Sequence, residues 1–290
     1  MVRYKGRDQI EYGHYPYTET NYGQEATSVT LYRIGYLTEI KPSYDPELNR
    51  QFVLRDSDEG KPLGIYSRKT NIRLTLSWLQ GELTDYYQKY LLGGYNTYAE
   101  AKQYHSATAK IYHKWTGLKL DTLTIRCSIG EPITWTAELI AQTTDTMNST
   151  TNTYGASPGA VWEWDDAYLQ LSTNGTDWTT IPDVTDWELR IENNLKPNHT
   201  FNPSGEKTLQ SLEEMEQHCN ARFTMYLPSD TYLAYLHDQT KLYLKLVLPC
   251  SQYIQFSEGK LSLYDPVLRP EDLVSCRVEY MGGYLEHSFT

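Results

Sequence analysis

Residues 118–142 have the sequence LKLDTLTIRCSIGEPITWTAELIAQ, which contains the clearest structural signal in the chain. Leu123 and Ile125 alternate with Thr and Arg residues, and the alternation resumes around Trp135 after a turn at Gly130. A period of two places apolar side chains on one face of a strand and polar side chains on the other. The stretch therefore predicts a β-hairpin with one apolar and one polar face.

The same alternation recurs along most of the chain, whereas helical patterning is confined to two short pieces. Helices are predicted only for ELTDYYQKYLL at residues 82–92, before a Gly-Gly pair, and for residues 229–239, after Pro228. An all-β protein with two short helices is the predicted fold class. Further strands are predicted at residues 72–78, 187–191, 222–227, 242–248 and 274–280.

The order of predicted elements occurs twice, which indicates an internal duplication. Each time a strand is followed by a long polar loop, a second strand, a helix and further strands, and Asn71 is aligned with Asn220. The Ser/Thr/Asn/Gly-rich stretch 143–159 has no periodicity and predicts a linker. The expected organisation is an N-terminal arm (1–25), a first half (26–142), a linker with a β-hairpin (143–180) and a second half (181–290).

Composition and charge exclude several classes of function. The 290 residues carry a formal net charge of −11 without a clustered basic stripe, which argues against tight nucleic-acid binding. No apolar run approaches the ~20 residues of a membrane span, and the first residues lack the apolar stretch of a signal peptide. We expect a soluble protein made in the cytoplasm, without a membrane partner. Its 26 Tyr suit half-buried surfaces that partners cover.

Sequence motifs of catalysis are absent, so the chain is predicted not to be an enzyme and to need no cofactor. It contains no GxSxG, HExxH, Walker or GxGxxG pattern. The adjacent carboxylates Asp165-Asp166 and Glu213-Glu214 are interpreted as solvated pairs rather than as a glycosidase site, because neighbours on a strand point to opposite faces.

A metal site or a disulfide scaffold is not expected either. His199, His218 and Cys219 are the only conceivable ligand group, and they lack the paired short spacings of a zinc site. The four cysteines are far apart and are predicted to be buried free thiols: Cys127, Cys219, Cys250 and Cys276.

The alternative function is that of a carbohydrate-binding or other surface-adhesion β-sandwich. WEWDDAYLQL at residues 162–171, followed by STNGTDW, resembles an exposed aromatic hairpin. A glycan platform requires coplanar exposed rings, but the parity that Trp162 and Trp164 share breaks at Asp165-Asp166, as at a bulge. Packing in the core or between subunits is the preferred interpretation of these rings.

Three stretches resemble the tail tube proteins of long-tailed, siphovirus-like phages and archaeal viruses, in the longer type with a duplicated tube domain. They are DVTDWELRIENNLKPNHTF (183–201), the Thr-Gly segment with its hairpin (116–142) and IGYLTEIKPSYDPE (34–47). The resemblance implies a structural virion protein of the tail. Its half-barrel halves would close into large β-barrel rings, which stack into a channel for the ejection of double-stranded DNA. It also implies tape-measure, tail-terminator or baseplate proteins as partners, and DNA in transit that is not tightly bound.

For such a tube, the polar parity of the strands predicts the wall of the channel, because the apolar parity must face the layer that contains the helices. The predicted wall is rich in hydroxyl groups and near neutral, with five Arg against four Glu and Asp186 restoring the balance. The predicted lumen-facing residues are Arg73, Thr75, Ser77, Thr122, Thr124, Arg126, Thr134, Thr136, Glu138, Glu188, Arg190, Glu192, Arg222, Thr224, Arg277 and Glu279.

Ring stoichiometry follows from the predicted duplication. If each chain supplies eight strands, three chains fill the wall that six single-domain subunits with four strands would fill. We therefore expect homotrimeric rings with pseudo-sixfold symmetry, with a homohexamer as the alternative. The long loops 41–70 and 193–218 are expected to reach the adjacent ring. The eight wall strands are predicted at residues 28–37, 71–79, 118–129, 133–142, 184–193, 220–227, 255–264 and 273–281.

Overall fold

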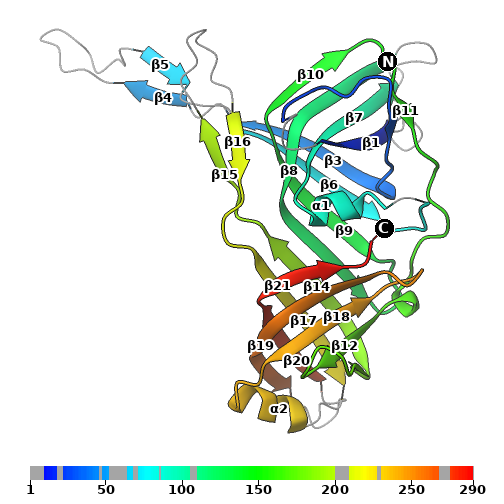
Figure 1. The fold of residues 1–290 in the computed structure, drawn as a ribbon, viewed down its shortest axis with the longest axis vertical. Helices are drawn as coiled ribbons and strands as arrows, with labels where there is room; N and C mark the ends of the chain where they lie inside the picture. Colours follow the sequence, from blue (N-terminus) through cyan, green and yellow to red (C-terminus); the bar gives the residue numbers. More distant parts are fainter. Residues whose placement is uncertain are drawn as a thin grey trace, which may run out of the picture.

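A computed structural model describes residues 10–17, 22–45, 48–51, 64–67, 71–84, 86–104, 110–199, 209–226, 230–267 and 275–289. Antiparallel strands dominate these residues, which include two short α-helices (Figure 1). The helical elements are α1 (Gln88–Leu92), α2 (Asp230–His237) and the 3-10 turn η3 (Trp164–Asp166). The strands are β1 (Ile10–Tyr17), β2 (Thr30–Leu31), β3 (Tyr36–Asp45), β4 (Leu48–Gln51), β5 (Gly64–Ser67), β6 (Asn71–Leu79), β7 (Asn96–Tyr104), β8 (Lys110–Ser128), β9 (Thr134–Ala141), β10 (Thr143–Met147), β11 (Thr153–Tyr154), β12 (Tyr168–Ser172), β13 (Thr179–Thr180), β14 (Val184–Glu192), β15 (Lys196–His199), β16 (Leu209–Glu213), β17 (His218–Tyr226), β18 (Leu242–Val247), β19 (Tyr253–Val267), β20 (Ser275–Gly282) and β21 (Tyr284–His287).

A continuous antiparallel sheet of eight strands, the main sheet, runs through the molecule in the order β3-β6-β9-β8-β14-β17-β20-β19. Side chains of the apolar parity, such as Leu74, Ile125 and Phe223, are fully buried. Each buried side chain of this size contributes about 1.5–3 kcal/mol through loss of its contact with water. The all-β fold class with two short helices is confirmed.

A second layer covers the apolar face of the main sheet, because its two longest strands extend beyond it. β8 also pairs with β7 and β10, and β7 pairs with β1; β19 also pairs with β18 and β21, and β18 pairs with β12. The buried residues of both layers belong to one large apolar core. In Figure 1 the first group of strands occupies the upper part of the molecule and the second group, with α2, the lower part.

These two groups have the same strand connections, and we call them the first strand set (β1, β3, β6–β10) and the second strand set (β12, β14, β17–β21). In the main sheet, β3-β6-β9-β8 corresponds to β14-β17-β20-β19. In the second layer, β1-β7-β8-β10 corresponds to β12-β18-β19-β21. The tandem arrangement predicted from the sequence is thereby confirmed, whereas the predicted domain boundaries stay a prediction.

Irregularities of the strands fix which residues correspond between the sets. The bulge at Thr97/Ala99 against β8 recurs at Leu242/Leu244 against β19. Gly117 (φ 59°) and Glu258 (φ 57°) adopt the same left-handed conformation in the middle of β8 and β19. The residue before each accepts an equivalent backbone hydrogen bond, Gln142 N to Thr116 O at 2.9 Å and Gly283 N to Ser257 O at 2.8 Å.

The residue alignment predicted for the duplication is wrong by two positions. Thr75 and Arg222 occupy equivalent places, because Thr75 faces Glu138 and Arg222 faces Glu279 at equivalent points of β9 and β20. Asn71 therefore corresponds to His218, not to Asn220. A shift of two residues preserves the parity of a strand, so the alternation of polar and apolar residues could not detect it.

The first predicted wall strand, at residues 28–37, is also wrong. Within this range only Thr30–Leu31 and the first two residues of β3 are strand, because Ser28 (φ 57°) and Gly35 (φ 137°) interrupt the extended backbone. A Cβ on Gly35 would lie 2.5 Å from Cδ1 of Trp78, so this close approach requires glycine. The wall strand is β3, although its residues 41–45 were predicted to belong to a loop.

The predicted helices have different outcomes. The second is confirmed as α2, although residues 227–229 lie outside the described residues. The first, predicted for residues 82–92, is helical only in α1. Glu82 instead exchanges backbone hydrogen bonds with the chain at Gly159 and Ala160, which holds this segment extended before the helix.

The segment 143–159 is not a free linker. β10 extends the second layer by pairing with β8, and β11 pairs in parallel with β2. Polar residues make the contacts, for example Val29 N to Asn152 Oδ1 at 3.2 Å and Asn152 Nδ2 to Ala26 O at 2.9 Å. Thr and Asn side chains therefore stabilise this stretch by hydrogen bonds that hydrophobic periodicity does not reveal.

The two segments predicted as long polar loops contain the hairpins β4–β5 and β15–β16, so they are not loops throughout. Their tips, residues 52–63 and 200–208, lie outside the described residues. β15–β16 packs through Leu195, Leu209 and Leu212 on Ile140 of β9. In Figure 1, β4–β5 projects away from the main sheet.

His14 is expected to make folding sensitive to pH. Its imidazole is fully buried between Tyr12 (ring centroids 4.6 Å apart) and Tyr87 (4.0 Å), and neither ring nitrogen has a hydrogen-bond partner within the described part of the chain. Burial lowers the pKa of His14 well below its usual value. The unfolded chain therefore binds a proton near pH 6.5 that the folded chain does not bind. The stability of the fold is therefore not reduced by His14 above pH 6.5, and it falls as the pH drops below 6.5.

We expect the free energy of unfolding to fall by about 1 kcal/mol between pH 6.5 and 5.5 through His14. His14→Phe, which keeps a ring in the stack, should flatten this dependence. Urea denaturation at both pH values, followed by Trp fluorescence, measures the difference. Equal pH dependence of the variant and the parent would contradict the assignment to His14.

Candidate functional site

All sixteen residues predicted to line a channel lie on one face of the main sheet, which we call the polar face. They belong to β6, β8, β9, β14, β17 and β20, and none of them is buried. Thr136, for example, faces Ser77 on one side and Thr124 on the other. The hydroxyl oxygens of Ser77 and Thr136 are 3.1 Å apart, which is a hydrogen bond between strands. That the polar face lines a channel remains a prediction.

Charged side chains on this face follow a regular cross-strand pattern. Arg126 faces Glu188, Glu188 faces Arg222, and Arg222 faces Glu279, so charges of opposite sign alternate across four neighbouring strands. Nη2 of Arg222 lies 3.1 Å from Oε2 of Glu188. Opposite charges at facing positions each contribute roughly 0.2–1 kcal/mol, and like charges would be destabilising.

Further ion pairs on the polar face join residues along one strand. Nη2 of Arg190 lies 2.7 Å from Oε1 of Glu192 on β14, and Arg277 of β20 forms an ion pair with Glu279. Because most guanidinium groups of this face already have a carboxylate partner, they have little positive charge to offer a phosphate. The net charge of the polar face is therefore close to zero, and its positive and negative side chains also lie next to one another.

Several further residues of the same face were not predicted from the sequence. Glu39, Lys41 and Ser43 of β3 share the parity of the polar face, because they face Ser77, Thr75 and Arg73. They were missed because β3 lacks the alternation of its neighbours: Pro42 and Tyr44 on its other parity are exposed. Only the register of β3 against β6 assigns them to this face.

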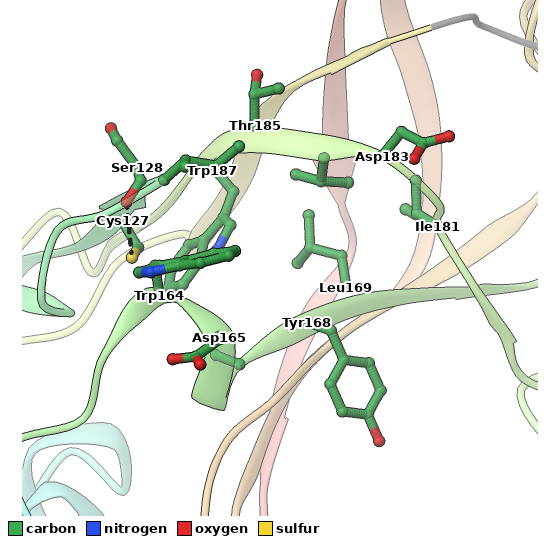
Figure 2. A pocket seen from close by; sticks show the side chains of 13 residues that line it. Cys127, Ser128, Trp164, Asp165, Tyr168, Leu169, Ile181, Asp183, Thr185 and Trp187 are labelled. Carbon is green, nitrogen blue, oxygen red and sulfur yellow. Dashed lines mark hydrogen bonds between the residues drawn. The ribbon is translucent and has the colours of Figure 1, made fainter.

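A hollow beside the end of β8 contains a cysteine and several aromatic side chains (Figure 2). It is lined by the indole rings of Trp164 and Trp187 and by Leu169, and the Sγ of Cys127 is 3.6 Å from the carbonyl oxygen of Ser128. Burial, with a smaller effect of Glu131, raises the pKa of Cys127 to about 11. The thiol therefore stays protonated and is a poor nucleophile at neutral pH.

The remaining candidates for chemistry are dispersed. No group of three His, Cys, Asp or Glu side chains suited to a metal ion occurs among the described residues. Burial raises the pKa of Cys219 to about 12. Cys127, Cys219 and Cys276 are buried free thiols as predicted, but Cys250 is exposed. No helix in the described part of the chain is long and apolar enough to cross a membrane.

The aromatic hairpin does not form a glycan platform. Trp162 is 1% exposed and contacts Tyr86 in the core, with ring centroids 5.9 Å apart, whereas Trp164 is 42% exposed in the turn η3. The parity breaks at Asp165-Asp166 through this 3-10 turn rather than through a bulge. Because one ring is buried and the other exposed, the two do not form a coplanar binding surface.

The chain is similar to a known protein family. A family model described as phage tail tube protein matches residues 17–262, which include all strands of the main sheet except part of β19 and all of β20. No curated protein matches the chain.

Two solved structures that resemble the chain are from gene transfer agent particles. One is a chain from the tail of an empty particle, refined with helical and C6 symmetry, with 12% identity and a TM-score of 0.37 over 45% of this chain and 99% of that chain. The other is a chain from the virion of a native particle, with 10% identity and a TM-score of 0.36 over 44% of this chain and 99% of that chain.

Proposed function

This chain belongs to the phage tail tube protein family, and on that premise we propose that it is a major tail tube subunit whose stacked rings conduct double-stranded DNA. The observation that carries the proposal is the main sheet, which has one polar face, one apolar face covered by a second layer, and a free edge at each end of its strand order. A sheet of this kind can join its neighbours edge to edge and close into a barrel, which removes the exposed edges.

The size of the main sheet favours three chains per ring. Each chain offers eight strands in continuous order, so three chains offer twenty-four. With ~4.8 Å between strands and a tilt of ~40°, such a barrel has a backbone diameter of roughly 48 Å, which leaves ~35 Å between side chains for a duplex ~20 Å wide. The proposed ring is therefore a homotrimer with pseudo-sixfold symmetry from the two strand sets.

Helical reconstruction of assembled tubes tests the ring directly. We expect three chains per ring and six quasi-equivalent strand sets around the axis. Six identical chains per ring would overturn the stoichiometry and leave the tail tube function intact, whereas failure to form hollow tubes would count against the function itself. Beyond their contacts within a ring, the hairpins β4–β5 and β15–β16 are proposed to reach the next ring. Hydrogen exchange of single rings against stacked tubes should show added protection of both hairpins on stacking.

The near-neutral polar face is proposed to let DNA pass without capture. Purified chains should not retain duplex DNA in a gel shift at low salt and sub-micromolar protein. The matched control is Glu138→Lys combined with Glu192→Lys, which replaces two negative charges per chain by two positive charges and should retain DNA in a salt-dependent way. Retention by the unmodified chain would contradict the proposal. Tape-measure and terminator or baseplate proteins are the further partners that this function implies.

A further inference from the structure

Two edges of the main sheet are free, and they lie on different strand sets. β3 pairs with β6 on one side, and residues 260–267 of β19 pair with β20 on one side; no other strand of the described residues covers the opposite sides. Residues 41–45 and 265–267 are exposed. An exposed strand edge offers unpaired N–H and C=O groups to another strand.

The chain already contains a junction between equivalent strands. Where the two strand sets meet, β14 pairs antiparallel with β8, from Asp186 facing Ser128 to Glu192 facing Thr122. By the repeated topology, β3 is the counterpart of β14, and β19 is the counterpart of β8. The free edges are therefore the two strands that would form this same junction between one chain and the next.

Equivalent bulges in β3 and β14 show which residues of β3 correspond to those that β14 uses in the internal junction. The bulge at Leu37/Glu39 of β3 corresponds to that at Val184/Asp186 of β14. In both bulges a threonine hydroxyl donates to the opposite strand, Thr38 Oγ1 to Ser77 O at 2.9 Å and Thr185 Oγ1 to Thr224 O at 3.3 Å. Lys41, Ser43 and Asp45 are thus the counterparts of Glu188, Arg190 and Glu192.

Bulges also fix the alignment of β19 with β8. The bulge at Leu120/Thr122 corresponds to that at Leu261/Leu263, and the left-handed residues Gly117 and Glu258 agree with this alignment. Leu263, Asp265 and Val267 are therefore the counterparts of Thr122, Thr124 and Arg126.

We propose that the partner of these edges is a second copy of the chain, and that β3 of one copy pairs antiparallel with residues 263–267 of the next in the register of the β14–β8 junction. Ser43 then faces Asp265, Lys41 faces Val267, and Asp45 faces Leu263. This inference rests on the proposed function, because it specifies the contact between neighbouring subunits of a ring.

The chemistry of the edges fits this register. Pro42 and Pro266, which have no N–H to donate, face one another, so the missing donors are confined to a single pair and the adjacent pairs remain complete. Tyr44 faces Tyr264 on the other parity, and Lys41 lies diagonal to Asp265, within reach of a long side chain. Prolines on free edges also hinder pairing in other contexts.

An exposed methionine supports the same junction independently. Ile140 of β9 is 3% exposed because it is covered by Leu195 and Leu212, from the hairpin that follows β14. Its counterpart in β20 is Met281, which is 59% exposed. Leu139 faces the bulge in β8, and Tyr280 faces the equivalent bulge in β19. The residues that follow them, Ile140 and Met281, therefore correspond.

The hairpin that would cover Met281 is β4–β5 of the neighbouring copy. β4–β5 follows β3 as β15–β16 follows β14, and the pair Arg50 and Ile65 corresponds in register to Pro197 and Leu212. In sequence, Leu48 and Ile65 occupy the positions of Leu195 and Leu212. The repeated order of elements and the shared register therefore place this hairpin of the neighbour at the position that the second strand set leaves uncovered.

Cysteine crosslinking tests the register. In a Cys250→Ser background, Ser43→Cys with Asp265→Cys places two thiols at facing positions, where strand geometry suits a disulfide. Oxidised assemblies should give covalent dimers and larger species on non-reducing gels. A mixture of the two single variants should give dimers only, because each chain then carries one thiol of the pair.

Two further variants calibrate the result. Thr124→Cys with Arg190→Cys, the corresponding pair in the internal junction, should form a disulfide within one chain. In Asp45→Cys with Val267→Cys the two thiols are four residues out of register, about 13 Å apart. This variant should form no covalent dimer and should run as a single chain on non-reducing gels. If rings assemble but the Ser43/Asp265 pair does not link, or the Asp45/Val267 pair does, the register is wrong while the proposed function stands. If no rings assemble, the proposed function fails as well.

Met281→Glu tests the hairpin contact separately. Placing a charge under the neighbour's hairpin should raise the protein concentration needed for ring assembly by about tenfold or more, which corresponds to roughly 1.4 kcal/mol per contact. Leu233→Glu, at an exposed apolar position on α2, is the control and should leave assembly unchanged. Equal effects of the two variants, or no effect of Met281→Glu, would overturn the assignment of β4–β5 to Met281.

Discussion

Replacing Glu100 by Ala is expected to lower the free energy of unfolding by about 3–5 kcal/mol, the cost of removing one partner from a buried polar network. The Glu100 carboxylate is fully buried on β7 and accepts four hydrogen bonds. Tyr98 Oη and Thr150 Oγ1 donate to Oε2 at 3.0 Å, Asn152 Nδ2 donates to it at 3.1 Å, and Tyr154 Oη donates to Oε1 at 3.0 Å. The carboxylate therefore joins β7 to the segment 150–154.

Urea denaturation of the unassembled chain measures this loss, and hydrogen exchange locates it. Because the network fixes residues 150–154 beside β2, the backbone of both segments should exchange faster in Glu100→Ala. Glu100→Gln keeps one acceptor oxygen and should lose less stability. Glu131→Ala, at an exposed turn, is the matched control and should change stability by no more than ~0.5 kcal/mol. A loss in Glu100→Ala as small as in this control would refute the role of the network.

Trp135→Ala is the second variant with a large expected effect, also about 3–5 kcal/mol, from the lost burial and the cavity left behind. Trp135 of β9 is fully buried and stacks on Trp78 of β6 with ring centroids 5.8 Å apart. Its ring also meets Phe289 edge to face at 6.0 Å. Phe289 follows β21 of the second strand set, so Trp135 packs the two sets against each other.

A double-mutant cycle of Trp135→Ala with Phe289→Ala should therefore be non-additive, with a coupling of about 0.5–1.5 kcal/mol for the aromatic pair. Thermal or urea unfolding of the four proteins gives this value. Trp164→Ala removes a tryptophan that is 42% exposed and should cost far less stability than Trp135→Ala. Additive losses would show that the contact between Phe289 and Trp135 does not couple the strand sets.

The composition of the polar face could be predicted because parity is a local property. In β6, Arg73, Thr75 and Ser77 must share a face whichever strands lie beside them. The charge alternation from Arg126 to Glu279 could not be predicted, because it depends on which strands are neighbours and on their register. The same limit explains the alignment error of two residues, since that shift leaves every parity unchanged.

Three features of the molecule are decided by contacts between distant parts of the chain. β3 is a wall strand because it pairs with β6, although its own sequence lacks an apolar face. Residues 143–154 are ordered because β8, β2 and Glu100 bind them, although their composition is that of a linker. The junction of β14 with β8 turns two strand sets into one sheet.

The sequence by itself therefore determined the strands with strong alternation, the second helix, the tandem order of elements and the composition of the polar face. Each of these depends on a period or an order that is written in a short stretch of residues. Only the tertiary structure decided the edges of the sheet and its registers. It also decided that Ile140 is buried while its counterpart Met281 is exposed. Edges and registers are set by which backbone groups find a partner far away in the sequence, and local patterns do not encode that choice.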